Sequence, residues 1–154
     1  MNWVLKFNSF ANAQHVDAVT ETVHRGANVV FCSRAREAEK GLAIQRDLQA
    51  SGCPGQACYQ VCDVRKESDI KRLIRVTLER YGCLDCLVNN AGDGYLQSSN
   101  DITAQDFENL MELNVVSYLL LTKYALPYLR QTKGNIVNMG SLHGVIGMKN
   151  DLPA

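Results

Sequence analysis

The sequence predicts an α/β fold in which parallel strands form a doubly wound sheet. Short apolar runs alternate with amphipathic helical patterns roughly every 30 residues, which is the spacing of right-handed βαβ units. The run at 84–88 lacks the polar alternation of a half-exposed strand, so it indicates a strand buried on both faces. It ends abruptly in Asn89-Asn90-Ala91-Gly92, at the strand end where open α/β sheets bind their ligands.

Composition narrows the class of protein. The 154 residues, 46% of them hydrophobic, suffice for one core, so we expect a single domain over 1–154. The 16 basic and 16 acidic residues cancel, which argues against nucleic-acid binding and against attachment to an anionic membrane surface. No apolar run is long enough to cross a membrane, and residues 1–10 lack the apolar core of a signal peptide. We therefore expect a cytoplasmic protein.

The six cysteines allow two interpretations. Cys58-x3-Cys62 and Cys83-x2-Cys86 have spacings that could form a zinc site. No histidine lies near either pair in the sequence, and in a reducing compartment cysteines commonly serve as small apolar core residues. We favour the second interpretation and predict no metal site.

The first half of the chain predicts strands at 3–7, 27–32 and 57–61, each an apolar run. Helices are predicted at 13–25, 36–50 and 67–81, because apolar residues recur there every three or four positions. The apolar positions of these helices are Val16, Val19, Val23, Leu42, Ile44, Leu48, Ile70, Leu73, Ile74, Leu78 and Tyr81.

The second half predicts one long helix and a last strand. Thr103 has the side chain of an N-cap, and Asp106 lies at the third helical position of a capping box. The helical pattern then continues through residues Phe107, Leu110, Met111, Val115 and Tyr118. Pro127 should bend or end this helix. Residues 135–139 predict a buried strand, followed by Gly140-Ser141.

Polar side chains follow four of the predicted strands. They are Ser33-Arg34, Asp63, Asn89-Asn90 and Ser141. The carboxyl ends of parallel strands share one edge of the sheet, so these residues predict a binding cleft there. Helix N-termini on that edge favour an anionic ligand such as a dinucleotide. Each residue also has a structural interpretation: Asp63 could be a helix N-cap, and the asparagines could serve only the turn.

Four motifs together resemble the short-chain dehydrogenase/reductase family, whose fold is Rossmann-like. The motifs are Cys62-Asp63-Val64, Asn89-Asn90-Ala91-Gly92, Asn114 within a helix, and residues 135–144 with Ser141. The resemblance implies that Asp63 and Val64 contact the adenine of NAD(P), and that Asn90, Ala91 and Gly92 also bind the cofactor. It implies that Ser141 is the catalytic serine and that Asn114 holds a catalytic water and distorts its helix.

The resemblance also implies an activity. Family members transfer hydride between NAD(P)(H) and a small-molecule carbonyl or alcohol. Residues 80–92 and 121–130 are most similar to the 17β-hydroxysteroid dehydrogenases, which suggests a steroid substrate.

Ser33 and Arg34 bear on the choice of cofactor. An acidic residue at the end of the second strand would bind the adenosine ribose of NAD and repel a 2′-phosphate. This chain has Ser33 there, followed by Arg34, which could pair with a 2′-phosphate. We therefore expect NADP to be favoured over NAD.

Two elements of the family pattern are missing from the sequence. Residues 1–25 contain no glycine, and Ser9, Ala13 and His15 occupy the places of the glycine-rich turn. We therefore expect weak cofactor binding. No Tyr-x-x-x-Lys follows Ser141, so residues 1–154 should lack the general base and be catalytically impaired. The sheet should be incomplete on its C-terminal side, with an exposed edge. An alternative to catalysis is a truncated, non-enzymatic form that pairs with full-length family subunits as a homo- or hetero-oligomer.

Overall fold

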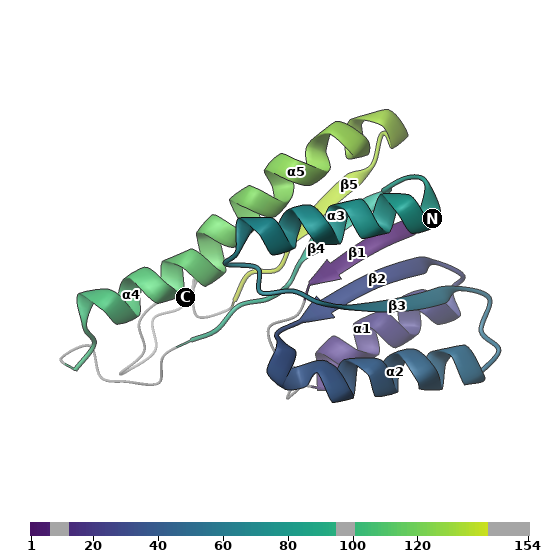
Figure 1. Ribbon diagram of the computed structural model, residues 1–154, viewed down its shortest axis with the longest axis horizontal. Helices are drawn as coiled ribbons and strands as arrows, with labels where there is room; N and C mark the ends of the chain where they lie inside the picture. The colour runs from purple at the N-terminus through teal and green to yellow at the C-terminus, as the bar shows by residue number, and fades with distance from the viewer. Residues whose placement is uncertain (7–12, 95–100, 142–154) are drawn as a thin grey trace.

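The computed structural model describes residues 1–6, 13–94 and 101–141 and has five parallel strands in one sheet. The strand order is β3-β2-β1-β4-β5, so the chain winds outward from β1 in both directions (Figure 1). The strands are β1 (Asn2–Lys6), β2 (Asn28–Ser33), β3 (Gln56–Val61), β4 (Cys86–Asn89) and β5 (Asn135–Asn138). This confirms the predicted α/β fold with a doubly wound parallel sheet.

Helices cover both faces of the sheet. Residues of α3 and α5 pack in the core on one face, and residues of α1 and α2 pack in the core on the other. In Figure 1, α5 lies along the top of the molecule, and α1 and α2 lie at the bottom. The helices are α1 (Ala13–His24), α2 (Ala38–Ala50), α3 (Glu67–Tyr81), α4 (Ala104–Met111) and α5 (Ser117–Thr132). A short 3₁₀ turn at Ala35–Glu37 precedes α2.

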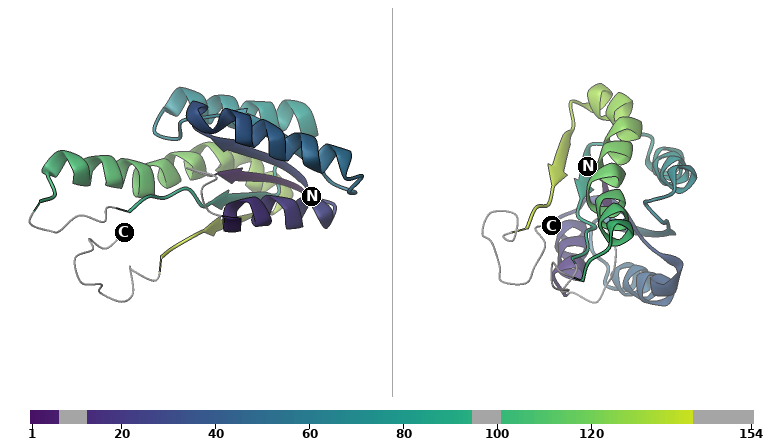
Figure 2. Two further views of the ribbon diagram at one scale, coloured as in Figure 1. Left: turned by 90° about the horizontal axis from the view of Figure 1, so that it is seen from below. Right: turned by 90° about the vertical axis from the view of Figure 1, so that its left-hand side faces the viewer.

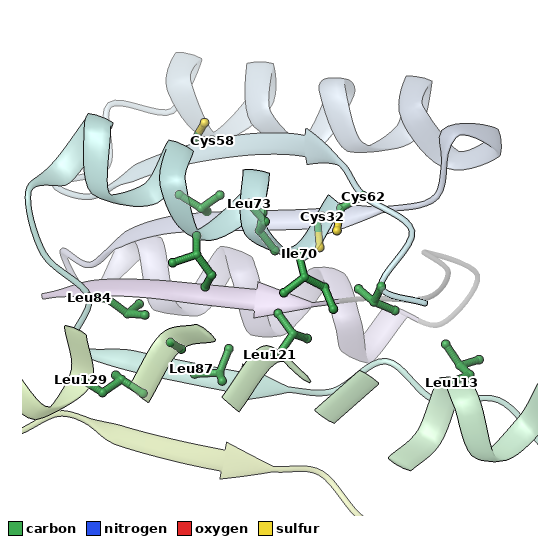
Figure 3. Packing of buried hydrophobic residues seen from close by; sticks show 14 residues of the cluster. Cys32, Cys58, Cys62, Ile70, Leu73, Leu84, Leu87, Leu113, Leu121 and Leu129 are labelled. Atoms are coloured by element: carbon green, nitrogen blue, oxygen red, sulfur yellow. The ribbon is translucent and has the colours of Figure 1, made fainter. Parts of the chain in front are cut away.

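Alternate residues of the buried strands supply two cores. On the face toward α3 and α5, Leu87 packs with Ile70 and Leu121 (Figure 3). On the opposite face, Phe31 of β2 packs against residues of α1 and α2, such as Val19 and Leu48. Burial on both faces explains why β2 and β4 show no polar alternation.

The helix predicted at 67–81 is confirmed by α3. Its residues Ile70, Leu73 and Ile74 are buried, as the apolar periodicity requires. Gly82 ends it in a left-handed conformation with φ of 75°. In α2 the prediction for Leu42 is wrong, because Gly41 faces the Tyr59 ring and leaves Leu42 43% exposed.

The strand predicted at 84–88 begins and ends later than expected. β4 starts at Cys86 and includes Asn89, whose side chain is buried. The two preceding carbonyl groups serve the junction between α5 and β5: Thr132 Oγ1 donates to the Leu84 oxygen at 2.7 Å, and the Asn135 N–H donates to the Asp85 oxygen at 2.9 Å. The expected strands 3–7 and 135–139 likewise differ by a residue or so from β1 and β5, and Phe7 lies outside the described residues.

Helix α4, a π-helical turn at Glu112–Val116 and α5 form one continuous rod whose α4 end extends beyond the sheet (Figure 2). Thr103 and Asp106 form the predicted capping box. Pro127 does not end the helix. It is exposed, so the carbonyl left without its helical donor lies on the solvent side.

Much of the apolar pattern along this rod faces outward rather than into the core, contrary to the expectation of one buried stripe. Leu110 and Leu113 are buried. The exposed apolar residues of the rod are Phe107, Met111, Val115, Val116 and Leu119. We call these five residues the outer apolar stripe.

Among the described strands, β5 lies at one edge of the sheet, as predicted. Ile136 packs toward the core beneath α5, whereas Val137 on the other side is 40% exposed. Among the described residues, no helix is both long enough and apolar enough to span a bilayer.

Candidate cofactor-binding site

All five strands run in the same direction, so their carboxyl ends open onto one edge of the sheet. Ser33 ends β2, Asp63 follows β3, Asn90 follows β4, and Ser141 lies beyond β5. The strand order changes direction between the neighbouring strands β1 and β4, and open α/β sheets bind ligands at such a switch point. The fold therefore places the predicted site residues along one edge.

Ser33 faces into the protein at this edge. Its side chain is fully buried, and its hydroxyl lies 2.8 Å from the Tyr59 hydroxyl on β3. The Tyr59 N–H donates to the Gln45 side chain at 2.6 Å, which ties this pair to α2. Burial raises the pKa of Tyr59, while the hydrogen bond with Ser33 opposes that shift. The Ser33–Tyr59 contact therefore ties the end of β2 to β3 and, through Gln45, to α2.

Arg34 follows β2 at the edge of the sheet and is partly exposed. Its Nε atom is buried and donates no hydrogen bond within the described chain. Burial lowers the pKa of Arg34, and the positive charges of Arg36 and Arg65 lower it further, while Asp63 and Asp93 oppose the shift. A partly buried guanidinium near two other cations is an arrangement that favours a phosphate group as ligand.

Asp63 is held by Arg65. Arg65 Nη2 lies 2.7 Å from Asp63 Oδ2, and Arg65 Nε lies 3.0 Å from Oδ1. The Arg65 backbone N–H also donates to Oδ1 at 3.2 Å. The side-chain pair with Arg65 is the largest cause of the lowered pKa of Asp63. Both carboxylate oxygens thus have donors before any ligand is present.

Asn114 reaches the loop that follows β4. Its Oδ1 accepts from the Asp93 N–H at 3.0 Å, and its Nδ2 donates to the Asp93 carbonyl at 2.9 Å. A Cβ on Gly92 would lie 3.3 Å from Asn114 Oδ1, so this position favours glycine. The π-helical turn contains Asn114, as the predicted distortion of the helix requires.

Val64 and Ala91 are buried, with side chains that belong to the core. They can offer a ligand only their backbone groups. Asn90 is partly exposed at the edge, between the buried residues Asn89 and Ala91.

One side-chain and one backbone hydrogen bond join the ends of β4 and β5. Asn89 Nδ2 donates to Asn138 Oδ1 at 2.8 Å, and the Met139 N–H donates to the Asn89 carbonyl at 2.9 Å. These bonds hold the backbone that leads to Ser141, which is exposed at the edge. Asn89 Oδ1 is buried without a hydrogen-bond donor in the described part of the chain.

Three of the predicted residues lie where the structure says nothing of their side chains: Ser9, Ala13 and His15, in place of the glycine-rich turn. Residues 142–154 also lie outside the described ranges. The site as described therefore comprises the residues that follow β2, β3 and β4, together with Asn114 and Ser141.

The two cysteine pairs do not converge. Cys58 and Cys62 pack in the core beneath α3, whereas Cys86 packs on the opposite face of the sheet. In the described ranges no three His, Cys, Asp or Glu side chains are grouped to hold a metal ion.

Sequence reasoning missed the roles of Tyr59, Arg65 and Asp93. Tyr59 sits inside a strand, where an aromatic residue is ordinary core. Arg65 is one of several charges that follow β3, but its spacing of two residues from Asp63 was a usable signal, since a turn can bring such neighbours together. Asp93 contributes backbone groups, which leave no mark in a sequence.

Comparisons with known proteins agree with this geometry. The family described as short chain dehydrogenase matches residues 16–152. The L-fucose dehydrogenase of Bos taurus is 41% identical over 132 residues, which are 85% of this chain and 46% of that protein. The 11-beta-hydroxysteroid dehydrogenase A of Sesamum indicum is 35% identical over 125 residues, 79% of this chain and 34% of that protein. The chain thus spans less than half the length of these curated relatives.

Solved structures show the same fold. A short chain dehydrogenase from Mycobacterium smegmatis superposes with a TM-score of 0.84 at 27% identity, over 97% of this chain and 62% of that one. An alcohol dehydrogenase from Thermococcus sibiricus, complexed with 5-hydroxy-NADP, has the same TM-score at 19% identity, over 97% of this chain and 63% of that one. With the family match and the edge geometry together, the chain belongs to the short-chain dehydrogenase family.

Proposed function

We propose that this chain forms the cofactor-binding half of an NADP(H)-dependent oxidoreductase that acts on an alcohol or carbonyl group. One observation carries the choice of cofactor: the buried Nε of Arg34 has no acceptor among the described residues, and Arg36 and Arg65 add positive charge beside it. A 2′-phosphate would supply the missing acceptor and the opposing charge. NAD would supply neither.

The remaining residues would hold the rest of the cofactor and the substrate. Asp63 would accept a hydrogen bond from the adenine, and the backbone at Val64 and Asn90–Gly92 would line the cleft. The bound nicotinamide supplies or accepts the hydride. Ser141 would donate a hydrogen bond to the substrate oxygen, and Asn114, braced on Asp93, would support the proton relay.

Residues 1–154 by themselves should bind the cofactor weakly and turn over poorly. The sequence has no glycine before residue 26 and no Tyr-x-x-x-Lys after Ser141. Loss of a positioned general base alone removes roughly 10²- to 10⁴-fold in rate.

The substrate class rests on the relatives. The mammalian relatives at about 40% identity are named L-fucose dehydrogenase, and a more distant one is named for an 11-beta-hydroxysteroid. We propose a sugar hemiacetal such as L-fucose ahead of a steroid. A specific kinship with 17β-hydroxysteroid dehydrogenase type 14 is a weaker alternative. A longer form of the chain that carries the missing base would be assayed with L-fucose and with a 17β-hydroxysteroid.

Thermal melts test the cofactor assignment. We expect millimolar NADPH to raise the Tm of residues 1–154 more than NADH does, because a contact between the 2′-phosphate and Arg34 lowers the Kd, and stabilisation grows with the ratio of ligand concentration to Kd. Arg34→Ala should remove the difference between the two cofactors. Arg46→Ala, an equal loss of charge on the exposed side of α2, is the matched control and should retain it. Equal responses to NADPH and NADH in the unsubstituted chain would refute the assignment.

A second candidate function is association with full-length subunits of the same family. The outer apolar stripe favours it, since exposed apolar surface of this extent commonly marks a protein interface. Co-expression of residues 1–154 with a tagged full-length relative should give a mixed oligomer, and Leu119→Asp should abolish it. Recovery of the chain as a monomer beside the relative would exclude this function.

A further inference from the structure

Arg65 occupies the carboxylate that the proposed cofactor would need. Its guanidinium makes two hydrogen bonds to Asp63, one to each oxygen, at 3.0 and 2.7 Å. With the Arg65 backbone N–H, these donors fill Oδ1 and leave one acceptor site on Oδ2, so the adenine amino group, itself a donor, would either share Oδ2 with Arg65 or displace the guanidinium. Cofactor binding at this edge therefore requires Arg65 to share Asp63 or to leave it.

Asp63 can release the guanidinium without losing every donor. The Arg65 backbone N–H donates to Oδ1 at 3.2 Å, independently of where that side chain lies. The Asp63 side chain is 19% exposed and the Arg65 side chain 35%, so Arg65 is the more accessible partner. The ion pair is thus the movable part of the contact.

The released guanidinium could bind a new partner on the same edge of the sheet. Arg34 and Asp63 follow neighbouring strand ends, since Ser33 pairs with Val61 and the Cys62 N–H donates to the Ser33 carbonyl at 2.9 Å, so Arg65 on Asp63 lies at the same edge as Arg34. Its charge lowers the pKa of Arg34, after burial and Arg36. A 2′-phosphate bound at Arg34 would therefore bring about two negative charges close to Arg65. A bidentate guanidinium–phosphate pair would replace the bidentate guanidinium–carboxylate pair.

We propose that Arg65 is a second, movable ligand of the 2′-phosphate: it rests on Asp63 in the free chain and transfers to the phosphate when the adenine takes over the carboxylate. This inference rests on the proposed NADP(H) site. It makes Arg65 a determinant of cofactor specificity, because NAD could displace Arg65 from Asp63 but could not give it a new partner.

Two small probes separate the contributions. Adenosine 2′,5′-bisphosphate carries the adenine and the 2′-phosphate, and 5′-AMP lacks the 2′-phosphate. Their Kd values would be measured by calorimetry on residues 1–154, for the unsubstituted chain and for Arg65→Gln. We expect the substitution to weaken the bisphosphate about tenfold, the value of one charged hydrogen-bonded contact. The affinity for 5′-AMP should stay constant or rise, because Asp63 is then free to accept from the adenine.

Two further variants complete the test. Arg65→Lys keeps the charge but not the bidentate geometry, and should fall between the other two in its preference for the bisphosphate. Arg75→Gln removes a cation from the exposed side of α3 and should change neither Kd. Circular dichroism of each variant would check that the fold is intact.

The outcomes are distinguishable. Arg65→Gln could leave both Kd values unchanged or change them by the same factor. Arg65 would then not be a phosphate ligand. If Arg34→Ala still removed the preference for the bisphosphate, this inference alone would fail and the proposed function would stand. If the unsubstituted chain binds neither probe, the proposed function and the inference fail together.

Discussion

At the scale of single residues, the sheet edge is defined by two pairs of side chains, one buried and one at the surface. Ser33 and Tyr59 share a buried hydrogen bond beneath Arg34. Asp63 and Arg65 pair at the surface, beside the same arginine. The buried pair fixes the backbone of the edge, and the surface pair sets its charge.

The pH dependence of stability should reveal the surface pair. Arg65 lowers the pKa of Asp63 in the folded chain, so the pair stabilises the fold above about pH 4 and loses its contribution as the pH falls through the folded pKa. Asp63→Asn should lower the free energy of unfolding by up to about 1 kcal/mol at pH 7, a figure limited by solvent screening. The deficit relative to the unsubstituted chain should shrink toward pH 3. Urea unfolding at pH 7, 5 and 3 measures it. Glu79→Gln, in an exposed pair with Arg75 at 3.7 Å, is the control and should give little deficit at any pH.

The buried pair should appear as coupling between two substitutions. Ser33→Ala and Tyr59→Phe each remove the hydrogen bond between the two buried hydroxyls, at a cost of about 1 kcal/mol or more. The double variant should be more stable than the sum of the two effects predicts, by about 1 kcal/mol. Denaturant melts of the four proteins give this coupling energy. Strict additivity would mean that the 2.8 Å contact contributes nothing to stability.

At the scale of elements, the π-helical turn and the capping box determine where the long rod begins and how it meets the site. The turn includes Asn114, whose amide holds Asp93 in place. The Ser117 hydroxyl donates back to the Leu113 carbonyl across the turn, which satisfies a buried polar group where the helix changes its winding. The rod therefore provides both a packing surface and a site residue.

The cap of α4 can be tested by itself. Thr103 Oγ1 accepts from the Asp106 N–H at 3.2 Å, and the Asp106 carboxylate accepts from the Thr103 N–H at 3.1 Å. Thr103→Ala should cost about 1 kcal/mol locally, seen as faster amide hydrogen exchange in the first turn of α4. Thr103→Ser keeps the hydroxyl and should retain the protection. Unchanged exchange in Thr103→Ala would show that packing rather than the cap holds this turn.

Elements were predictable from the sequence where one face is buried and one is not. The helical spacing of Ile70, Leu73 and Ile74 made α3 predictable, because only one face of this helix is apolar. The outer apolar stripe follows the same period as Leu110 and Leu113, so the sequence could not say which residues face the sheet. The sequence placed Ser33 at the edge, but the direction of its hydroxyl depends on Tyr59, 26 residues further along the chain. The ion pair between Arg65 and Asp63 was not predicted, because it depends on the local turn after β3 and not on any sequence periodicity.

At the scale of the whole molecule, one core beneath α3 and α5 carries much of the packing. Leu121 is fully buried there, two residues from Leu119, which is 65% exposed. The rod thus has one face packed in the core and one face of exposed apolar side chains.

Matched substitutions on α5 measure this division. Leu121→Ala should lower the free energy of unfolding by about 2–5 kcal/mol, since it removes buried methyl groups and leaves a cavity. Leu119→Ala should change it by no more than about 0.5 kcal/mol. Urea unfolding of both variants provides the comparison. A similar cost for both would mean that the outer apolar stripe is covered in solution.

The central place of β1 has a consequence for synthesis. This strand leaves the ribosome before the other described strands, yet it pairs with β2 on one side and β4 on the other. About 80 residues of chain lie between β1 and β4, so one edge of the nascent sheet stays unpaired for roughly 4–16 s at ordinary elongation rates. During that interval β1 and β2 present a strand edge on which a chaperone, or a second nascent chain on the same message, could act.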